Sequence, residues 1–89
     1  MMNYRNIERI VKGIANHRRV QILELLEKKP ELSVFEISEE IKSEFKNVSV
    51  HIAKMAQAGL VMKRHEGSSV CHALTKRGKS ILQFYRTLE

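Results

Sequence analysis

Apolar residues recur every three or four positions through most of the first 58 residues, the spacing that places them on one face of a helix. Short polar segments interrupt this spacing at regular intervals, so the apolar faces belong to separate helices. The pattern therefore predicts four helices, at about 4–15, 17–29, 34–42 and 45–58.

Several residues mark where these helices begin and end. Asn16 has the side-chain acceptor of an N-cap, and Ser33 followed by Glu36 three residues later forms a capping box. Pro30, the only proline, ends the second helix. Gly59 supplies the left-handed residue that commonly ends a helix, so the fourth helix is expected to stop just before it.

The same spacing predicts which side chains form the core. In the second helix, Val20, Leu23 and Leu26 lie on the apolar face. In the third and fourth helices, the residues expected to point inward are Val34, Ile37, Ile41, Phe45, Val48, Ile52 and Met55.

Beyond Gly59 the pattern becomes that of strands. Residues 60–65 and 70–74 predict two short strands, and the polar linker between them has the turn chemistry of a hairpin. Thr75 then caps a last helix. The expected fold is mainly α with a small β-hairpin, in the order α-α-α-α-β-β-α. A short helix, a tight turn and a longer helix before a hairpin predict a winged helix-turn-helix domain.

Length and charge narrow the functional classes. The 89 residues suffice for one domain, so 1–89 is expected to be a single unit. The formal net charge is +6, and its distribution is uneven. Residues 1–44 carry eight Lys or Arg and eight Glu, whereas residues 45–89 carry eight and two. The whole surplus lies after Glu44, which favours a polyanionic partner in that half, most often nucleic acid and less often an anionic membrane surface.

Other classes find little support. The chain has no run of 18 apolar residues and no signal-peptide core, so no membrane span is expected. It contains no Asp, no Gly-rich phosphate loop and no nucleophile elbow, so we expect neither an enzyme nor a cofactor. His65, Cys71 and His72 share the hairpin, but adjacent strand residues point to opposite faces, which disfavours a metal site. A lone cysteine favours a reducing cytoplasm.

The outward face of the fourth helix has the chemistry of a recognition helix. Lysines neutralise phosphates, Asn and Ser make compact hydrogen bonds, and a small apolar residue can contact a thymine methyl. An ordinary solvated helix face is the alternative, but residues 45–65 contain no acid, whereas solvated faces usually mix both signs. The candidate DNA-contacting residues on this helix are Lys46, Asn47, Ser49, Val50, His51 and Lys54.

The hairpin and the helix after it add further cations. Lys63, Arg64 and His65 could reach a flanking backbone or a minor groove, although edge-strand protection would also explain them. Lys76 and Arg77 open the last helix, where cations oppose the helix dipole, so an anion nearby is favoured.

The sequence resembles the ArsR-type winged-helix repressors, and more distantly MarR-like proteins, from about Lys12 to Leu88. The most specific part is Val48-Ser49-Val50-His51-Ile52 followed by Ala58-Gly59-Leu60-Val61. The resemblance implies a dimer that binds operator DNA, with its recognition helix at 44–58 and its wing near Arg64. It also implies that Lys46, Asn47, Ser49 and His51 occupy DNA-contacting positions.

Two departures from that family stand out. Arsenic-sensing relatives carry two cysteines where this chain reads Ser33-Val34-Phe35, and residues 75–89 lack the His and acid ligands of relatives with a zinc site. No metal site of either kind is therefore expected. In the turn before the recognition helix, Ser43 replaces a usual apolar residue, and Phe45 is expected to fill that place.

The two ends of the chain carry apolar stripes that one small core hardly needs, so 1–15 and 75–89 are expected to be dimerisation helices. Packing of these helices against each other within one chain is the alternative. The candidate interface residues are Tyr4, Ile7, Val11, Ile81, Phe84, Tyr85 and Leu88.

These features predict a cytoplasmic, homodimeric transcriptional regulator, most simply a repressor, that binds a pseudo-palindromic double-stranded operator. The effector is not visible in the sequence. Two alternatives stay open: a winged-helix module that binds proteins rather than DNA, and a redox-responsive regulator that acts through Cys71.

Overall fold

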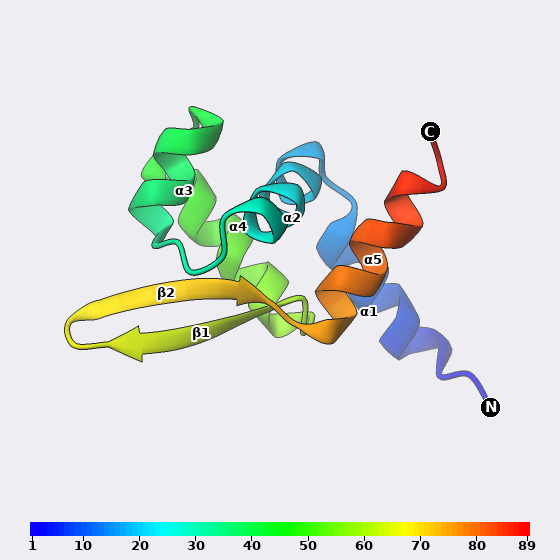
Figure 1. The fold of residues 1–89 in the computed structure, drawn as a ribbon. Helices are drawn as coiled ribbons and strands as arrows, with labels where there is room; N and C mark the ends of the chain where they lie inside the picture. The colour runs from blue at the N-terminus through cyan, green and yellow to red at the C-terminus, as the bar shows by residue number, and fades with distance from the viewer.

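A computed structural model describes residues 1–89. Five helices and one antiparallel hairpin follow each other in the expected order, so the predicted winged helix-turn-helix fold is confirmed (Figure 1). The elements are α1 (Tyr4–Ile14), α2 (His17–Lys28), α3 (Val34–Ile41), α4 (Phe45–Gln57), β1 (Val61–Glu66), β2 (Ser69–Leu74) and α5 (Lys76–Arg86).

The core lies around α2, which contributes three fully buried side chains, Ile22, Leu23 and Leu26. Helices α3 and α4 pack against one side of it, and β2 and α5 against the other. In Figure 1 the hairpin projects from one end of the molecule while α1 and α5 lie at the opposite end. The remaining buried apolar residues are Ile14, Ile37, Ile41, Val48, Ile52, Met55, Ala58, Leu60, Val61, Leu74 and Leu82.

The helix boundaries follow the capping residues. The Asn16 side chain accepts from the Arg18 and Arg19 amides, and Ser33 with Glu36 forms both halves of the capping box. Gly59 has φ +76°, and the amide of the next residue, Leu60, bonds back to the fourth helix in a Schellman arrangement. These local predictions are confirmed.

Three expected core residues are not fully buried. Phe45 is 54% exposed, because it is the first residue of α4 and helical side chains lean toward the N-terminus, so its ring projects past the start of the helix. Val34, the first residue of α3, is half-buried but packs against the core, whereas Val20 of α2 is half-buried and is not part of it. The expected inward face of α4 therefore begins at Val48.

The hairpin is tied to the helical part by a short third pairing. The loop residue Leu32 forms a bridge with His72 on β2, with backbone hydrogen bonds from Glu31 N to His72 O and from His72 N to Leu32 O. Strand β1 begins and ends one residue later than predicted, β2 begins one residue earlier, and Gly67, with φ +64°, lies in the turn between them. The base of the wing is thus fixed to the loop before α3.

Candidate nucleic-acid interface

The turn between α3 and α4 sets the direction of the recognition helix. Lys42 adopts the left-handed conformation with φ 54°, and the Ser43 amide donates to the Ser38 carbonyl, so the chain changes direction between the two helices. The inward faces of the two helices meet through buried apolar side chains, among them Ile37 and Val48. The opposite face of α4 consequently points away from the core.

That outward face contains the predicted DNA-contacting residues. Val50 is 50% exposed although it is apolar, and no acid lies on α4. The face therefore offers lysine ammonium groups, an amide, a hydroxyl and one apolar contact, without an internal counter-charge. The exposed members are Lys46, Asn47, Ser49, Val50 and Lys54.

His51 is held differently from its neighbours. It is half-buried, and the Nε–H of Arg19 on α2 donates to its Nδ1 at 3.1 Å. Burial and then the adjacent Arg19 guanidinium lower the pKa of His51 below its usual value. Because Nδ1 is an acceptor in this pair, the neutral ring carries its proton on Nε2, which leaves Nε2–H as a donor for a ligand.

The wing cations divide between the two faces of the hairpin. Lys63 pairs in register with His72, and Arg64 pairs with Cys71, so the two basic residues point to opposite sides. Arg64 forms ion pairs with Glu31 and Glu66 and is therefore partly neutralised.

The cations at the start of α5 have one clear local partner. Arg77 donates from Nη1 to the Ala58 carbonyl at 2.9 Å, at the C-terminal end of α4. The anion expected near this basic stretch is thus, for Arg77, the negative end of a neighbouring helix. Lys76 is exposed and makes no ion pair.

The structure also brings together basic residues that the sequence reasoning missed. Arg9 and Lys12 on α1 and Arg19 on α2 line a groove with Lys54 of α4. The eight Lys or Arg and the eight Glu of residues 1–44 cancel in a charge count, so net charge alone does not indicate this groove. The available signal was the spacing of Arg5, Arg9 and Lys12, which puts three cations on one stripe of α1.

Comparisons with known proteins show which family the chain belongs to. The model for bacterial regulatory proteins of the arsR family matches residues 16–63, more than half of the chain. HlyU from Vibrio cholerae N16961 is 32% identical over 97% of this chain and 94% of its own, with a TM-score of 0.81. The chain belongs to the arsR family. It is therefore a DNA-binding transcriptional regulator, in a family and fold that are not those of enzymes.

Other structures share the fold. HlyU from Vibrio vulnificus CMCP6 is 31% identical over 97% of this chain and 90% of its own, with a TM-score of 0.76. The winged helix-turn-helix domain of Mb0332 from Mycobacterium bovis, described as homodimeric, has a TM-score of 0.86 at 24% identity, covering 96% of this chain and 79% of its own. No curated protein matched the sequence.

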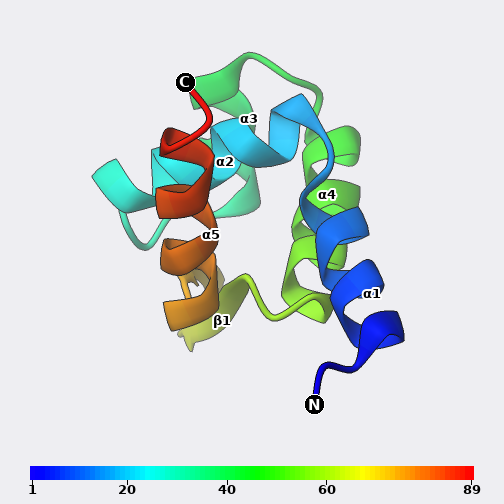
Figure 2. The same cartoon turned by 90° about the vertical axis from the view of Figure 1, so that its right-hand side faces the viewer.

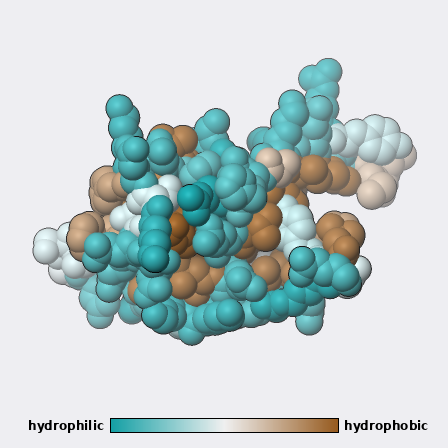
Figure 3. Space-filling view, turned by 90° about the horizontal axis from the view of Figure 1, so that it is seen from above, coloured by the Kyte–Doolittle hydropathy of each residue, from teal (hydrophilic) through white to brown (hydrophobic).

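In this ArsR-family protein the terminal helices leave apolar side chains on the surface. Phe84 is 55% exposed and Val11 49%, whereas Tyr85 is half-buried and donates from its hydroxyl to the Ile14 carbonyl at 2.6 Å. In Figure 2, which views the molecule from this end, α5 at the left and α1 at the lower right both face the viewer, and Figure 3 shows hydrophobic surface on the right-hand part, where they lie. Tyr4, Ile7 and Leu88 are also exposed, and Ile81 is half-buried.

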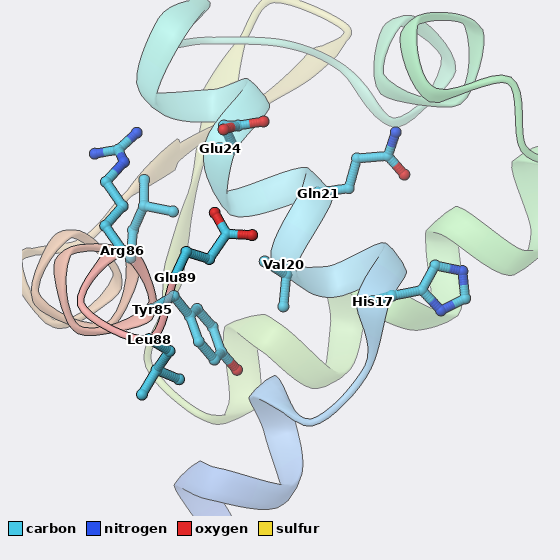
Figure 4. Close-up of a pocket in the computed structure, with 9 residues that line it drawn as sticks. His17, Val20, Gln21, Glu24, Tyr85, Arg86, Leu88 and Glu89 are labelled. Atoms are coloured by element: carbon cyan, nitrogen blue, oxygen red, sulfur yellow. The ribbon is translucent and has the colours of Figure 1, made fainter.

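An open groove of about 440 Å³ runs between α2 and α5 beside these residues. Figure 4 shows its lining, in which Val20 from α2 lies opposite Tyr85 and Leu88. An ion pair between Arg86 and Glu27 joins the same two helices. The apolar surface of α5 thus continues into a partly apolar groove.

The free cysteine, metal binding and membrane insertion are the remaining points that the sequence raised. Cys71 is a free, half-buried thiol on β2, and no three His, Cys, Asp or Glu side chains are grouped closely enough to hold a metal ion. None of the helices has both the length and the apolar character that crossing a membrane requires.

Proposed function

We propose that this ArsR-family protein is a homodimeric repressor that reads a pseudo-palindromic operator with the outward face of α4. The observation that carries the proposal is the acid-free, exposed row of polar and basic side chains on that helix, next to a basic wing. A recognition helix in the major groove needs this combination.

The residues divide into two roles. Asn47 and His51 have directional hydrogen-bonding groups suited to base edges, and the Nε2–H of His51 would select an acceptor. Lys46, Lys54 and Arg64 would neutralise phosphates, with Lys63, His65, Lys76 and Arg77 as further backbone contacts. Ser49 and Val50 complete the proposed base-reading surface.

A dimer is supported by the exposed apolar side chains of α1 and α5 and by the homodimeric state described for Mb0332. Two-fold symmetry then predicts half-sites about one helical turn, roughly 10 bp, apart. Repression as the outcome of binding is supported by the resemblance to ArsR-type repressors.

Selection of bound duplexes from a random pool, followed by binding measurements on variants, tests this function. Lys54→Ala and Arg64→Ala should weaken binding to every duplex and flatten the salt dependence by about one unit each. Asn47→Ala and His51→Ala should change which sequence is selected. Lys28→Ala, on the far end of α2, serves as the control and should change neither.

Equal losses for all four variants on selected and random duplexes would contradict the division of roles. Failure of the wild-type protein to bind any duplex at low salt would contradict the DNA-binding surface itself, and retained binding of a protein partner would then favour an interaction module.

A further inference from the structure

We infer that the groove between α1 and α4 is a phosphate site that holds the DNA backbone beside the proposed base-reading surface of α4. The inference rests on the proposed recognition role of α4 and adds to it a second element, α1, for which no DNA contact was expected. The groove has a volume of about 370 Å³ and contains no acidic lining residue. Its lining is Arg9, Lys12, Gly13, Ala15, Asn16, Arg19, Lys54, Gln57 and Ala58.

The close approach of two helices forms the floor of this groove. Gly13 is buried on α1, and a Cβ built there would lie 2.8 Å from the Ala58 Cβ. Without a side chain at Gly13, the end of α1 lies directly on the end of α4. The cations of both helices are thereby brought to the two walls of one groove.

Arg19 is fixed in place before any ligand binds. Its Nη1 donates to the carbonyls of Lys12 and Gly13, at 3.3 and 3.2 Å, and its Nε donates to His51. Its Nη2 donates to no protein atom, so two N–H groups of a rigidly held guanidinium stay free. A preorganised arginine with a free edge is suited to a phosphate oxygen.

The other basic side chains of this groove form only weak interactions within the protein. Lys12 lies 3.7 Å from Glu8, a pair in which both side chains are largely exposed, and Lys54 has no acidic partner. Arg9 donates to the neutral Asn6 side chain at 2.6 Å. An exposed pair of this kind contributes little, so Lys12 remains available to a polyanion.

The position of Lys54 identifies the source of the phosphate. Lys46, Val50 and Lys54 lie four residues apart on one stripe of α4, so the groove continues the proposed base-reading face. Lys46 and Lys54 are separated by about 12 Å along the helix axis. The major groove is also about 12 Å wide. When the first turns of α4 lie in the major groove of DNA, the C-terminal end of α4, beside α1, meets the DNA strand that borders the major groove.

Salt-dependent binding of a selected duplex tests the site with the double variant Arg9→Gln/Lys12→Gln. The slope of log K against log salt should fall by about one to two per protomer, since each phosphate contact contributes about 0.9. The preferred sequence should not change, because phosphate contacts carry no base information. The control is Lys28→Gln/Lys79→Gln, which also removes two positive charges but near Glu27, at the other end of α2. It should leave the slope of log K against log salt closer to the wild-type value.

A second measurement distinguishes DNA phosphate from a free anion. Inorganic phosphate is titrated at constant ionic strength while the amide signals of Gly13 and Asn16 are followed by NMR. We expect inorganic phosphate to bind only weakly to the groove. Saturation below millimolar phosphate, together with an unchanged DNA salt slope in the double variant, would assign the groove to a free anion and overturn the inference.

The outcomes separate the two proposals. If the wild-type protein binds duplexes and both double variants have the same slope, the groove assignment is wrong while the role of α4 stands. If the wild-type protein binds no duplex, both are wrong.

Discussion

At the scale of single residues, the surroundings of two histidines lower their pKa values. His72 is only 2% exposed, and its Nδ1–H donates to the Leu32 carbonyl at 3.0 Å. Burial lowers the pKa of His72, and burial with nearby Arg19 lowers the pKa of His51. In the unfolded chain both rings take up protons near pH 6.5. The unfolded state therefore binds more protons below that pH, and acidification should favour it until the native pKa values are reached.

The free energy of unfolding is thus expected to fall as pH decreases from 7.5 to 5.5, in urea titrations at fixed ionic strength. His72→Gln should reduce the dependence on pH whatever it does to stability at pH 7.5, because it removes one of the two rings. His65→Gln, an exposed ring on the wing, is the control and should keep the wild-type slope. A wild-type slope in His72→Gln would show that burial of this ring has no energetic link to pH.

At the scale of elements, the helix ends explain why so much of the fold is readable from the chain. Asn16, Ser33, Thr75 and Gly59 satisfy backbone groups locally, so their roles depend on few distant contacts. Phe45 shows the limit of such reasoning. Periodicity assigns it to the inward face, but whether the first turn of a helix reaches the core depends on where its neighbours end.

Helix α3 should be the element most sensitive to its cap, since it has only eight residues. The Ser33 hydroxyl accepts from the Glu36 amide at 3.1 Å, and hydrogen bonds from Ser33 lower the pKa of the Glu36 carboxyl. Ser33→Ala should cost about 1 kcal/mol of unfolding free energy, measured by urea denaturation. Ser80→Ala, at an exposed position within α5, should cost nothing measurable. A loss no larger than that of Ser80→Ala would mean that packing alone holds α3.

At the scale of the whole molecule, tertiary packing creates surfaces that no single segment shows. The face of α4 could be predicted from sequence because all its residues share one helix. The basic groove could not, because Arg9, Arg19 and Lys54 come from three helices whose contact depends on Gly13. The same is true of Arg77, whose partner is the Ala58 carbonyl on another element.

The apolar side chains of α1 and α5 should hold two copies of the chain together. Sedimentation at micromolar concentration should give about twice the 10.3 kDa mass of one chain. Phe84→Glu should shift the population to monomer, because it places a charge in the proposed interface. Phe35→Glu changes an equally exposed ring on α3, 59% exposed against 55%, and should leave the dimer intact. A single 10.3 kDa species for the wild-type chain would contradict the dimer.

The bridge between Leu32 and His72 also has a consequence for the order of folding. It joins residues 40 apart in the chain, and closing a flexible loop of that length costs about 3 kcal/mol in chain entropy. The loop contains α3, α4 and β1, so these segments shorten it as they form. We therefore expect the bridge to form late, after the two helices, and to join the hairpin and the helix pair into one cooperative unit that unfolds together.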